Sequence, residues 1–246
     1  MRRKTLRLDS QSTETHGALG TILWYEWDFA GAEREFRRAI VLDPSDGAAH
    51  RLYGWLLIAL GRFEEAQAQM RRPLDNEPLN DFNLMELGLS HYFARQYEQA
   101  IEQSRRAIGV DSTSYWSHML LGWAHEQQGG FSAAIDDLSQ ASRLCDNPQV
   151  IASLGHVYAA SGSRAEAQKV IAALQVSSNR RYVSPYDVAS IYAGLGDKEQ
   201  TLVWLEKAYE DRSGWLALWV KVDPKFDALR TEPRFRNLLH RIGHAS

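Results

Sequence analysis

The chain has 246 residues, of which 44% are hydrophobic and 24% charged, and its formal net charge is −3. This composition predicts a soluble folded protein, and the net charge gives no indication of the strongly basic surface that nucleic-acid binding requires. The single cysteine, Cys145, excludes an internal disulfide and suits a reducing compartment. The basic first residues lack the apolar stretch of a signal peptide, and the longest apolar run, 55–60, is too short to cross a bilayer. We therefore expect a cytoplasmic protein.

A glycine, or in the last case an alanine, recurs along the chain at a nearly constant spacing. The steps between its positions are 34, 34, 34, 33 and 34 residues, and the positions are Gly20, Gly54, Gly88, Gly122, Gly155 and Ala189. In the first unit the surrounding residues are apolar or small and the unit ends at a proline: Leu19, Leu23, Phe29, Ala32, Phe36, Ala39 and Pro44. This pattern resembles the tetratricopeptide repeat (TPR), with His16 and Leu23 where the motif has Trp and Tyr.

The repeat predicts an all-α fold, a right-handed superhelical TPR solenoid. Each unit is expected to form two antiparallel helices, which bury their apolar faces against each other and against the next unit. The predicted organisation is a disordered leader at 1–12, six repeats at 13–46, 47–80, 81–114, 115–147, 148–181 and 182–213, and a C-terminal capping segment at 214–246.

Two local features along the repeats carry separate expectations. Four aromatic residues lie between Trp24 and Phe29, and we interpret them as packing at the turn of an end repeat that has a neighbour on one side only. Pro73 stands where the motif usually has alanine inside the second helix. A proline inside a helix removes a hydrogen bond and clashes one turn back, so we predict a kink or an early helix end near Arg72.

The period is lost after Gly214, and a different pattern follows. Phe235, Leu238 and Leu239 fall at spacings of three and four residues, with arginines at other positions. This spacing predicts an amphipathic helix with one apolar face, as expected of a cap on an open solenoid end.

In TPR proteins the concave face is lined chiefly by positions two, five, nine and twelve of each first helix. In repeats two to four these positions hold mainly aromatic, methionine and leucine residues, which are common in interface cores. We predict a partner-binding groove there; the alternative is that these side chains pack on the next repeat in a tight superhelix. The predicted groove residues are Arg51, Trp55, Ile58, Phe82, Met85, Leu89, Tyr92, Trp116, Met119, Trp123 and Glu126.

The clamp with which chaperone-binding TPR domains hold a terminal carboxylate is built from lysine, asparagine and arginine. The matching positions here are occupied by Gly17 and Thr21, Arg51 and Trp55, and Phe82 and Glu86. A co-chaperone function is therefore not expected.

The sequence offers no catalytic motif, so we expect neither enzyme activity nor a cofactor. It has no phosphate-binding glycine loop, no strand-to-helix nucleophile turn and no HExxH metal motif. His240 and His244 lie four residues apart, but no Asp, Glu or Cys joins them at ligand spacing, and no metal site is expected. Five further histidines fall at repeat positions typical of packing, and Cys145 is interpreted as a structural thiol; these histidines are His16, His50, His91, His118 and His125.

Three stretches, at 24–44, 180–216 and 221–243, resemble the C-terminal TPR region of multidomain bacterial signalling proteins. In that group the array follows a winged-helix DNA-binding domain, a serine/threonine kinase domain or a nucleotide cyclase domain. The most specific part lies around Asp223-Pro224 and 232–235. None of these effector domains is present in the 246 residues, so the chain is expected to be a fragment or a stand-alone relative. The resemblance implies an interaction or regulatory role.

Two functions remain open at this point. The first is a protein-interaction scaffold that binds a peptide or helix of a partner protein in the concave groove, as the regulatory part of a bacterial signalling or transcription-regulating system. The alternative is a ligand-sensing or autoinhibitory module that controls an attached effector domain. Self-association through the groove or the open first repeat is compatible with both. No nucleic-acid or membrane partner is expected.

Overall fold

The computed structural model describes residues 12–244, and within them it is entirely helical. Six antiparallel helical hairpins follow one another, which confirms the predicted all-α TPR superhelix. The expected leader lies outside the described residues except for Ser12, which caps the first helix. The hairpins are α1 (Thr13–Tyr25) with α2 (Phe29–Leu42), α3 (Gly47–Leu60) with α4 (Phe63–Asn76), α5 (Asp81–Phe93) with α6 (Tyr97–Val110), α7 (Tyr115–Gln127) with α8 (Phe131–Leu144), α9 (Pro148–Ala160) with α10 (Arg164–Ser177), and α11 (Pro185–Gly194) with α12 (Lys198–Glu210).

Short polar side chains begin several of these helices. Asp46 accepts hydrogen bonds from the first backbone N–H groups of α3, and Asn147 does the same for α9, where Pro148 takes the first helical position. Asp197 accepts a hydrogen bond from the backbone N–H of Gln200 at 3.0 Å and so caps α12. These caps satisfy N–H groups that a helix cannot pair within itself.

The small residues of the repeat let the two helices of a hairpin approach closely. A Cβ atom on Gly122 would lie 2.7 Å from Cγ of Leu138 and 3.1 Å from the carbonyl oxygen of Ala134, both in the partner helix α8. No side chain larger than hydrogen fits there without movement of the partner helix. The regular spacing of the small residues in the sequence thus marks the places where the two helices of each hairpin come into close contact.

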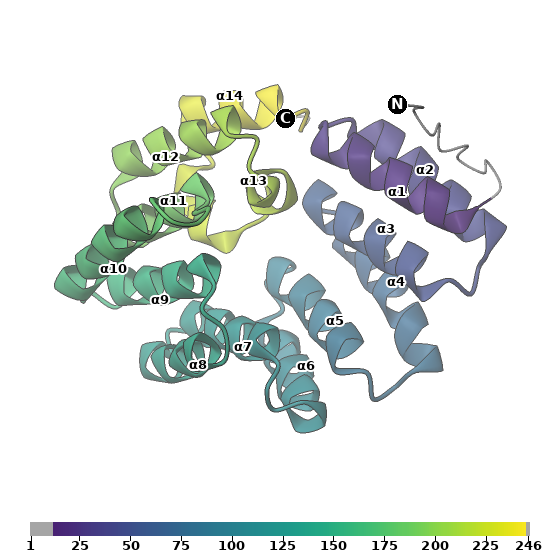
Figure 1. Cartoon of the computed structure of the whole chain (residues 1–246), viewed down its shortest axis with the longest axis horizontal. Helices are drawn as coiled ribbons and strands as arrows, with labels where there is room; N and C mark the ends of the chain where they lie inside the picture. The colour runs from purple at the N-terminus through teal and green to yellow at the C-terminus, as the bar shows by residue number, and fades with distance from the viewer. Residues whose placement is uncertain (1–11, 245–246) are drawn as a thin grey trace, which may run out of the picture.

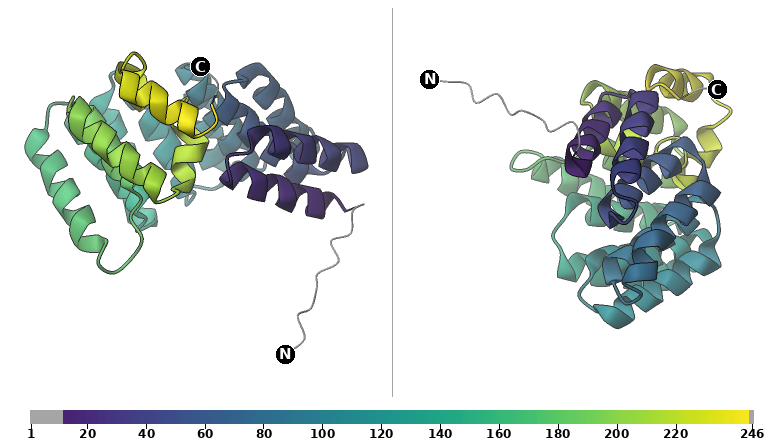
Figure 2. Two further views of the ribbon diagram at one scale, coloured as in Figure 1. Left: turned by 90° about the horizontal axis from the view of Figure 1, so that it is seen from above. Right: turned by 90° about the vertical axis from the view of Figure 1, so that its right-hand side faces the viewer.

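The six hairpins curve into an almost closed ring (Figure 1). The first helix of each hairpin lies on the inner side of the ring and the second on the outer side. We call α1, α3, α5, α7, α9 and α11 the inner helices. In Figure 2 the hairpins stack side by side along the ring, and α14 runs beside α12. Between residues 12 and 244, no helix is both long and apolar enough to cross a bilayer.

The residues after the last hairpin fold into the middle of the ring. This C-terminal segment, residues 214–229, comprises α13 (Gly214–Trp219) and the 3-10 helix η1 (Pro224–Leu229). Figure 1 places α13 at the centre, between the first and last inner helices. The final helix α14 (Pro233–Arg241) buries Phe235 and Leu238, so the predicted amphipathic face is confirmed.

Trp219 is the main contact between the C-terminal segment and the inner helices. Its side chain is 2% exposed and its ring stacks on Phe93 at a centroid distance of 4.5 Å. The ring of Trp55 approaches it from α3 at 5.1 Å. The same hydrophobic core therefore includes residues of the second and third hairpins and residues more than 100 positions later in the chain.

The first hairpin also meets the end of the chain, which corrects the expectation of a neighbour on one side only. Trp27, at the turn between α1 and α2, lies between Tyr209, at a centroid distance of 4.9 Å, and the guanidinium of Arg212, at 4.2 Å. The ring of Phe29 stacks on His244 at 4.6 Å. These aromatic contacts form a seam that closes the ring.

The expected early helix end near Arg72 is wrong. Helix α4 continues through Pro73 to Asn76, and the N–H of Glu77 still donates to the carbonyl of Pro73 at 3.0 Å. Proline removes only the hydrogen bond that its own N–H would donate, and the residues after Pro73 stay helical to Asn76. Its ring is buried beside the start of α3 at Gly47.

Replacing Gly122 by leucine is expected to destabilise the fold by ~1–3 kcal/mol, because the added side chain overpacks the contact with α8. Gly109 is the matched control: it lies in α6, and a Cβ atom added to it would meet no atom within 4 Å, so Gly109→Ala should be neutral or mildly stabilising. Urea unfolding of both variants measures the difference. Equal stability of the two variants would contradict the close-approach argument.

Replacing Trp219 by alanine is expected to cost ~3–5 kcal/mol, since it empties the contact at the centre of the ring. Trp204 is a suitable control because it is only partly buried and its ring faces Lys207, 4.0 Å from the ammonium. Chemical denaturation of Trp204→Ala should show the smaller loss. If Trp219→Ala is the milder of the two, the C-terminal segment does not hold the ring together.

Candidate functional site

The predicted groove residues all lie on the inner helices α3, α5 and α7, but most of them are covered. Four are partly exposed: Arg51, Trp55, Phe82 and Trp116. The other seven are buried, and for these the expected exposure is wrong: Ile58, Met85, Leu89, Tyr92, Met119, Trp123 and Glu126. Two features cover them: the C-terminal segment fills part of the interior, as Lys225 does over Trp123, and the next repeat packs against the rest, as His156 does against Glu126.

Aromatic and cationic side chains of the C-terminal segment fill the interior of the ring. Trp215 of α13 meets Trp116 of α7 edge-on at a centroid distance of 6.1 Å. The ammonium of Lys225 lies over the ring of Trp123 at 4.1 Å, and its side chain is almost fully buried. Trp55 and Trp123, which share position nine of their repeats, thus both pack against the chain itself.

Hydrogen bonds made by buried polar side chains connect the inner helices α7, α9 and α11. Trp123 donates from Nε1 to Oγ of Ser153 at 2.9 Å. The ring of His156 bridges two helices, with Nε2 2.7 Å from the carboxylate of Glu126 and Nδ1 donating to the carbonyl of Ser190 at 2.6 Å. Glu126 therefore acts as a structural partner of the next repeat, because a buried polar group must find its partner inside the protein.

The C-terminal segment is too deeply buried for a partner to displace it at modest cost. Its Leu216, Trp219, Val220 and Phe226 are essentially fully buried. Burial of each such side chain contributes ~1.5–3 kcal/mol, so exposing all four would cost on the order of 10 kcal/mol. A nanomolar complex releases only about 12 kcal/mol in total, so displacement would cancel most of its binding free energy.

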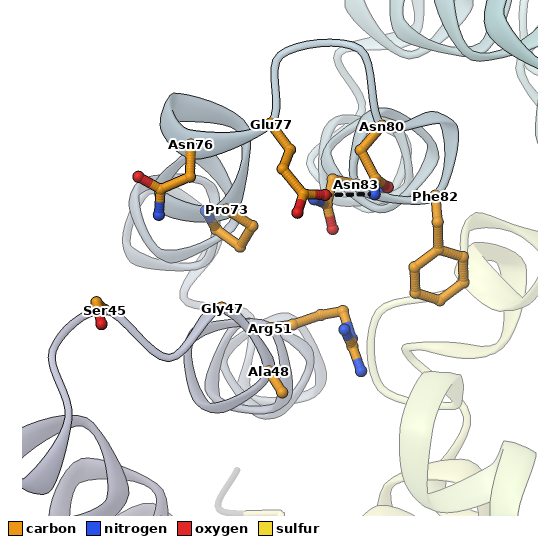
Figure 3. A pocket seen from close by; sticks show the side chains of 10 residues that line it. All are labelled: Ser45, Gly47, Ala48, Arg51, Pro73, Asn76, Glu77, Asn80, Phe82 and Asn83. Atoms are coloured by element: carbon orange, nitrogen blue, oxygen red, sulfur yellow. Dashed lines mark hydrogen bonds between the residues drawn. The ribbon is translucent and has the colours of Figure 1, made fainter.

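Arg51 lines two of the cavities at the edge of this filled interior. The first, of about 310 Å³, lies between α3, α4 and the start of α5. Figure 3 shows Arg51 extending from α3 toward Phe82, with Asn76, Asn80 and Asn83 on the opposite wall. The second, of about 270 Å³, is largely apolar and lies between α1, α3 and α13, where its walls include Trp24, Tyr25, Leu52, Trp55, Trp215 and Leu218. We call the two cavities together the Arg51 site.

The guanidinium of Arg51 borders both cavities. Its side chain is 34% exposed, and no residue between 12 and 244 accepts a hydrogen bond from it. It lies 5.4 Å from the ring centroid of Phe82, which is itself 42% exposed. Its nearest anion is Glu86, whose Oε1 is 3.5 Å from Nε of Arg51.

Glu86 does not neutralise Arg51 fully. Burial raises the pKa of the Glu86 carboxyl to about 8, against the opposing effects of Arg51 and of a 2.7 Å hydrogen bond donated by Trp55 Nε1. At neutral pH the carboxyl is therefore largely protonated. The Arg51 site therefore holds a guanidinium bordered by aromatic rings, and across the first cavity from it the carboxylate of Glu77 accepts a hydrogen bond from Asn80 at 2.8 Å.

Amide side chains line the other wall of the first cavity. Asn83 is 8% exposed, and its side chain makes no hydrogen bond to any residue in the described range 12–244. A carboxamide offers both a donor and an acceptor, the same pair that a peptide backbone needs. The wall can thus bind an extended main chain.

The histidines have structural contacts. His50 pairs through Nδ1 with Gln69 at 2.6 Å, and His125 through Nδ1 with Asp137 at 2.7 Å. His244 stacks on Phe29 at the seam, and burial lowers its pKa to about 4. Within residues 12–244, no three His, Cys, Asp or Glu side chains lie close enough together to hold a metal ion.

Tyr25, Asn83 and Trp215 line the site but were not among the predicted residues. Tyr25 and Asn83 occupy repeat positions outside the four that usually line a concave face. Trp215 lies after the last repeat, in the segment expected to cap the solenoid end. The apolar run 215–220 was the available signal that this segment could fill a groove.

Comparisons with known proteins agree with this architecture. The tetratricopeptide repeat family matches residues 18–79 and 85–147, slightly more than half of the chain. No curated protein matches the chain.

Solved structures share the fold at low sequence identity. TTC0263, a thermophilic TPR protein of Thermus thermophilus, is 18% identical with a TM-score of 0.55, and the match covers 93% of this chain and 100% of that one. PilW, a type IV pilus biogenesis factor, is 16% identical with a TM-score of 0.61 over 74% and 84% of the two chains. The APC/C hetero-tetramer Cut9–Hcn1 is similar at 17% identity and a TM-score of 0.62, over 95% of this chain and 43% of the other.

Replacing Glu86 by glutamine is expected to remove a pH dependence of stability. The folded-state pKa of about 8 lies above the usual value of 4.5, so ionisation destabilises the fold as pH rises between these values. Glutamine keeps an acceptor for Trp55 and cannot ionise. Glu86→Gln should match the wild type near pH 5 and exceed its free energy of unfolding near pH 9 by roughly 1–4 kcal/mol.

Urea unfolding at both pH values provides the measurement, and Glu64→Gln on the exposed side of α4 is the control. A stability difference between Glu86→Gln and the wild type that does not change with pH would show that the carboxyl is ionised throughout.

Proposed function

The chain belongs to the tetratricopeptide repeat family, and on this premise we propose that it is a protein-interaction scaffold that binds an extended peptide segment of a partner at the Arg51 site. The observation that carries the proposal is the guanidinium of Arg51, which donates no hydrogen bond within residues 12–244 and lies between two cavities beside the exposed ring of Phe82. Arginine and aromatic residues of this kind dominate binding energy at protein interfaces.

The two cavities favour a peptide of a particular chemistry. The apolar cavity between α1, α3 and α13 suits one large apolar or aromatic side chain. The cationic Arg51 suits a carboxylate next to that side chain, because charge-assisted hydrogen bonds are the stronger ones. The amides of Asn76 and Asn83 suit the peptide backbone between them. The partner segment is thus acidic and aromatic.

The wider role we propose is regulatory, within a bacterial signalling or transcription-regulating system of the cytoplasm. The support is the resemblance of 24–44, 180–216 and 221–243 to the TPR regions of such proteins. A ligand-sensing module is the second candidate. It is favoured by the closed ring, in which the C-terminal segment and the first hairpin share one core, so that a ligand bound near α13 acts on both.

The peptide proposal is tested by selection from a random peptide library displayed on phage, with the wild-type chain as bait. Selected peptides should carry Asp or Glu close to an aromatic residue. The double variant Arg51→Glu, Phe82→Ser should bind them at least about tenfold more weakly, because the charge reversal repels the carboxylate.

The matched control removes apolar side chains from the outer side of the ring. Val41 and Val110 are exposed on α2 and α6, and Val41→Ser with Val110→Ser should leave peptide affinity unchanged. Circular dichroism must show that both double variants keep their helices. If the peptides bind the outer variant more weakly and the Arg51 variant as tightly as the wild type, they bind on the outer side of the ring, and the proposed Arg51 site is wrong.

A further inference from the structure

A third cavity lies on the other side of Trp215 from the Arg51 site. Its volume is about 420 Å³, and its walls come from the α8–α9 connection and the start of α9, the connection before α11 and the first turn of α11, and α13. The residues that matter for its chemistry are Cys145, Asp146, Arg181, Tyr182, Asp187 and Trp215. None of them belongs to the predicted groove.

Asp187 is the exceptional residue of this cavity. It is 5% exposed, yet its carboxylate accepts no hydrogen bond from any residue between 12 and 244. Burial raises the pKa of the carboxyl to about 7, with the nearest opposing charge on Lys225. A buried carboxylate without a donor is costly, so a group that donates to Asp187 would be bound favourably.

The other charged groups around the cavity already have partners. Arg181 donates to the backbone carbonyl and to the carboxylate of Asp146, at 2.6 and 2.9 Å. Lys225 lies over the ring of Trp123 and 3.8 Å from Asp223. Since Arg181 and Asp146 offset each other, Asp187 sets the net charge of the cavity, and that charge is negative when it is ionised.

Aromatic side chains complete the walls. Trp215 is partly exposed to the cavity, and Tyr182 borders it with its hydroxyl donating to Asp211 at 2.5 Å. The face of an aromatic ring attracts a cation, and a tryptophan beside a carboxylate is a favourable pair for an ammonium ion. The carboxylate of Asp187 and the ring of Trp215 both favour a positively charged ligand.

We propose that this cavity binds a primary ammonium group on an alkyl chain, with Asp187 as its counter-ion and Trp215 as its aromatic wall. The ammonium offers three donors to a carboxylate that has none, and the alkyl chain lies along the apolar part of the wall. A lysine side chain of a partner and a free alkylamine present the same chemistry. The cavity shares Trp215 with the Arg51 site but has its own counter-ion, Asp187, and the proposal does not rest on peptide binding at the Arg51 site.

The chain carries a reporter for this cavity. Cys145 is its only cysteine and lines the cavity. The rate at which methyl methanethiosulfonate modifies Cys145, followed by mass spectrometry, therefore measures occupancy of the cavity. The probes are n-butylammonium chloride and, as its uncharged match, n-butanol, at equal concentration and ionic strength.

We expect butylammonium to slow the modification of Cys145 in a saturable way and butanol to have little effect. Protection should be stronger near pH 8 than near pH 6, because Asp187 is ionised only above its pKa while the amine is charged at both values. Asp187→Asn should raise the apparent dissociation constant of butylammonium at least about tenfold. Asp136→Asn, which removes an exposed carboxylate of α8 outside the cavity, should leave it unchanged.

Three results would overturn the proposal: no protection by butylammonium, equal protection by butanol, or unchanged protection in Asp187→Asn. The first two comparisons use the wild-type chain alone, so they decide the question even if the Asp187 variant folds poorly. A peptide carrying a single lysine, compared with the same peptide carrying norleucine, then separates a partner side chain from a free amine. Protection by butylammonium but not by the lysine peptide assigns the site to small amines.

Discussion

The inner helices of this ring carry large apolar side chains on the face that an open solenoid would leave in water, and Trp219 is the residue that covers them. Its ring contacts Phe93 of α5 and Trp55 of α3, and its neighbours Leu216 and Val220 are fully buried beside it. Without the C-terminal segment, this apolar face would have to stay exposed or bind something else. Packing of one short helix thus buries the centre of this face, and its Trp215 lines two of the cavities that remain.

The hairpins could be predicted from the sequence because the signal is local and repeated. A glycine or alanine at one position of each repeat marks a helix–helix contact, as the 2.7 Å clearance at Gly122 shows. Ring closure could not be predicted in this way. The contacts at Trp27 and Trp219 join residues far apart in the chain, and the period that aligns the repeats stops before the segment that makes them. Pro73 is a smaller example: its cost depends on its distance from the helix end, which the repeat pattern fixes only within a turn.

Part of the candidate site could also be predicted, because the repeat pattern assigns each residue a position on its helix. Arg51, Trp55 and Phe82 follow from repeat position and lie at the open edge of the interior. Leu89 and Trp123 hold equivalent positions but are buried, since a repeat position determines which way a side chain faces and not what covers it. Trp215 and Asp187 come from outside the usual lining positions, and they line one cavity because α13 packs beside the last hairpins. Which of the groove positions are exposed to solvent therefore could not be predicted from the sequence and is known only from the structure.

The seam between the first hairpin and the end of the chain has a consequence for how such an array can change over time. In an open solenoid each unit meets only its neighbours, so units can be duplicated or lost at modest cost. Here Trp27 must meet Tyr209 and Arg212, and Phe29 must meet His244, across a gap that six hairpins span. One inserted or deleted hairpin would move these partners apart and pull α13 away from Trp55. A change in the number of hairpins therefore carries an added cost here, the loss of the seam contacts, that an open solenoid does not have.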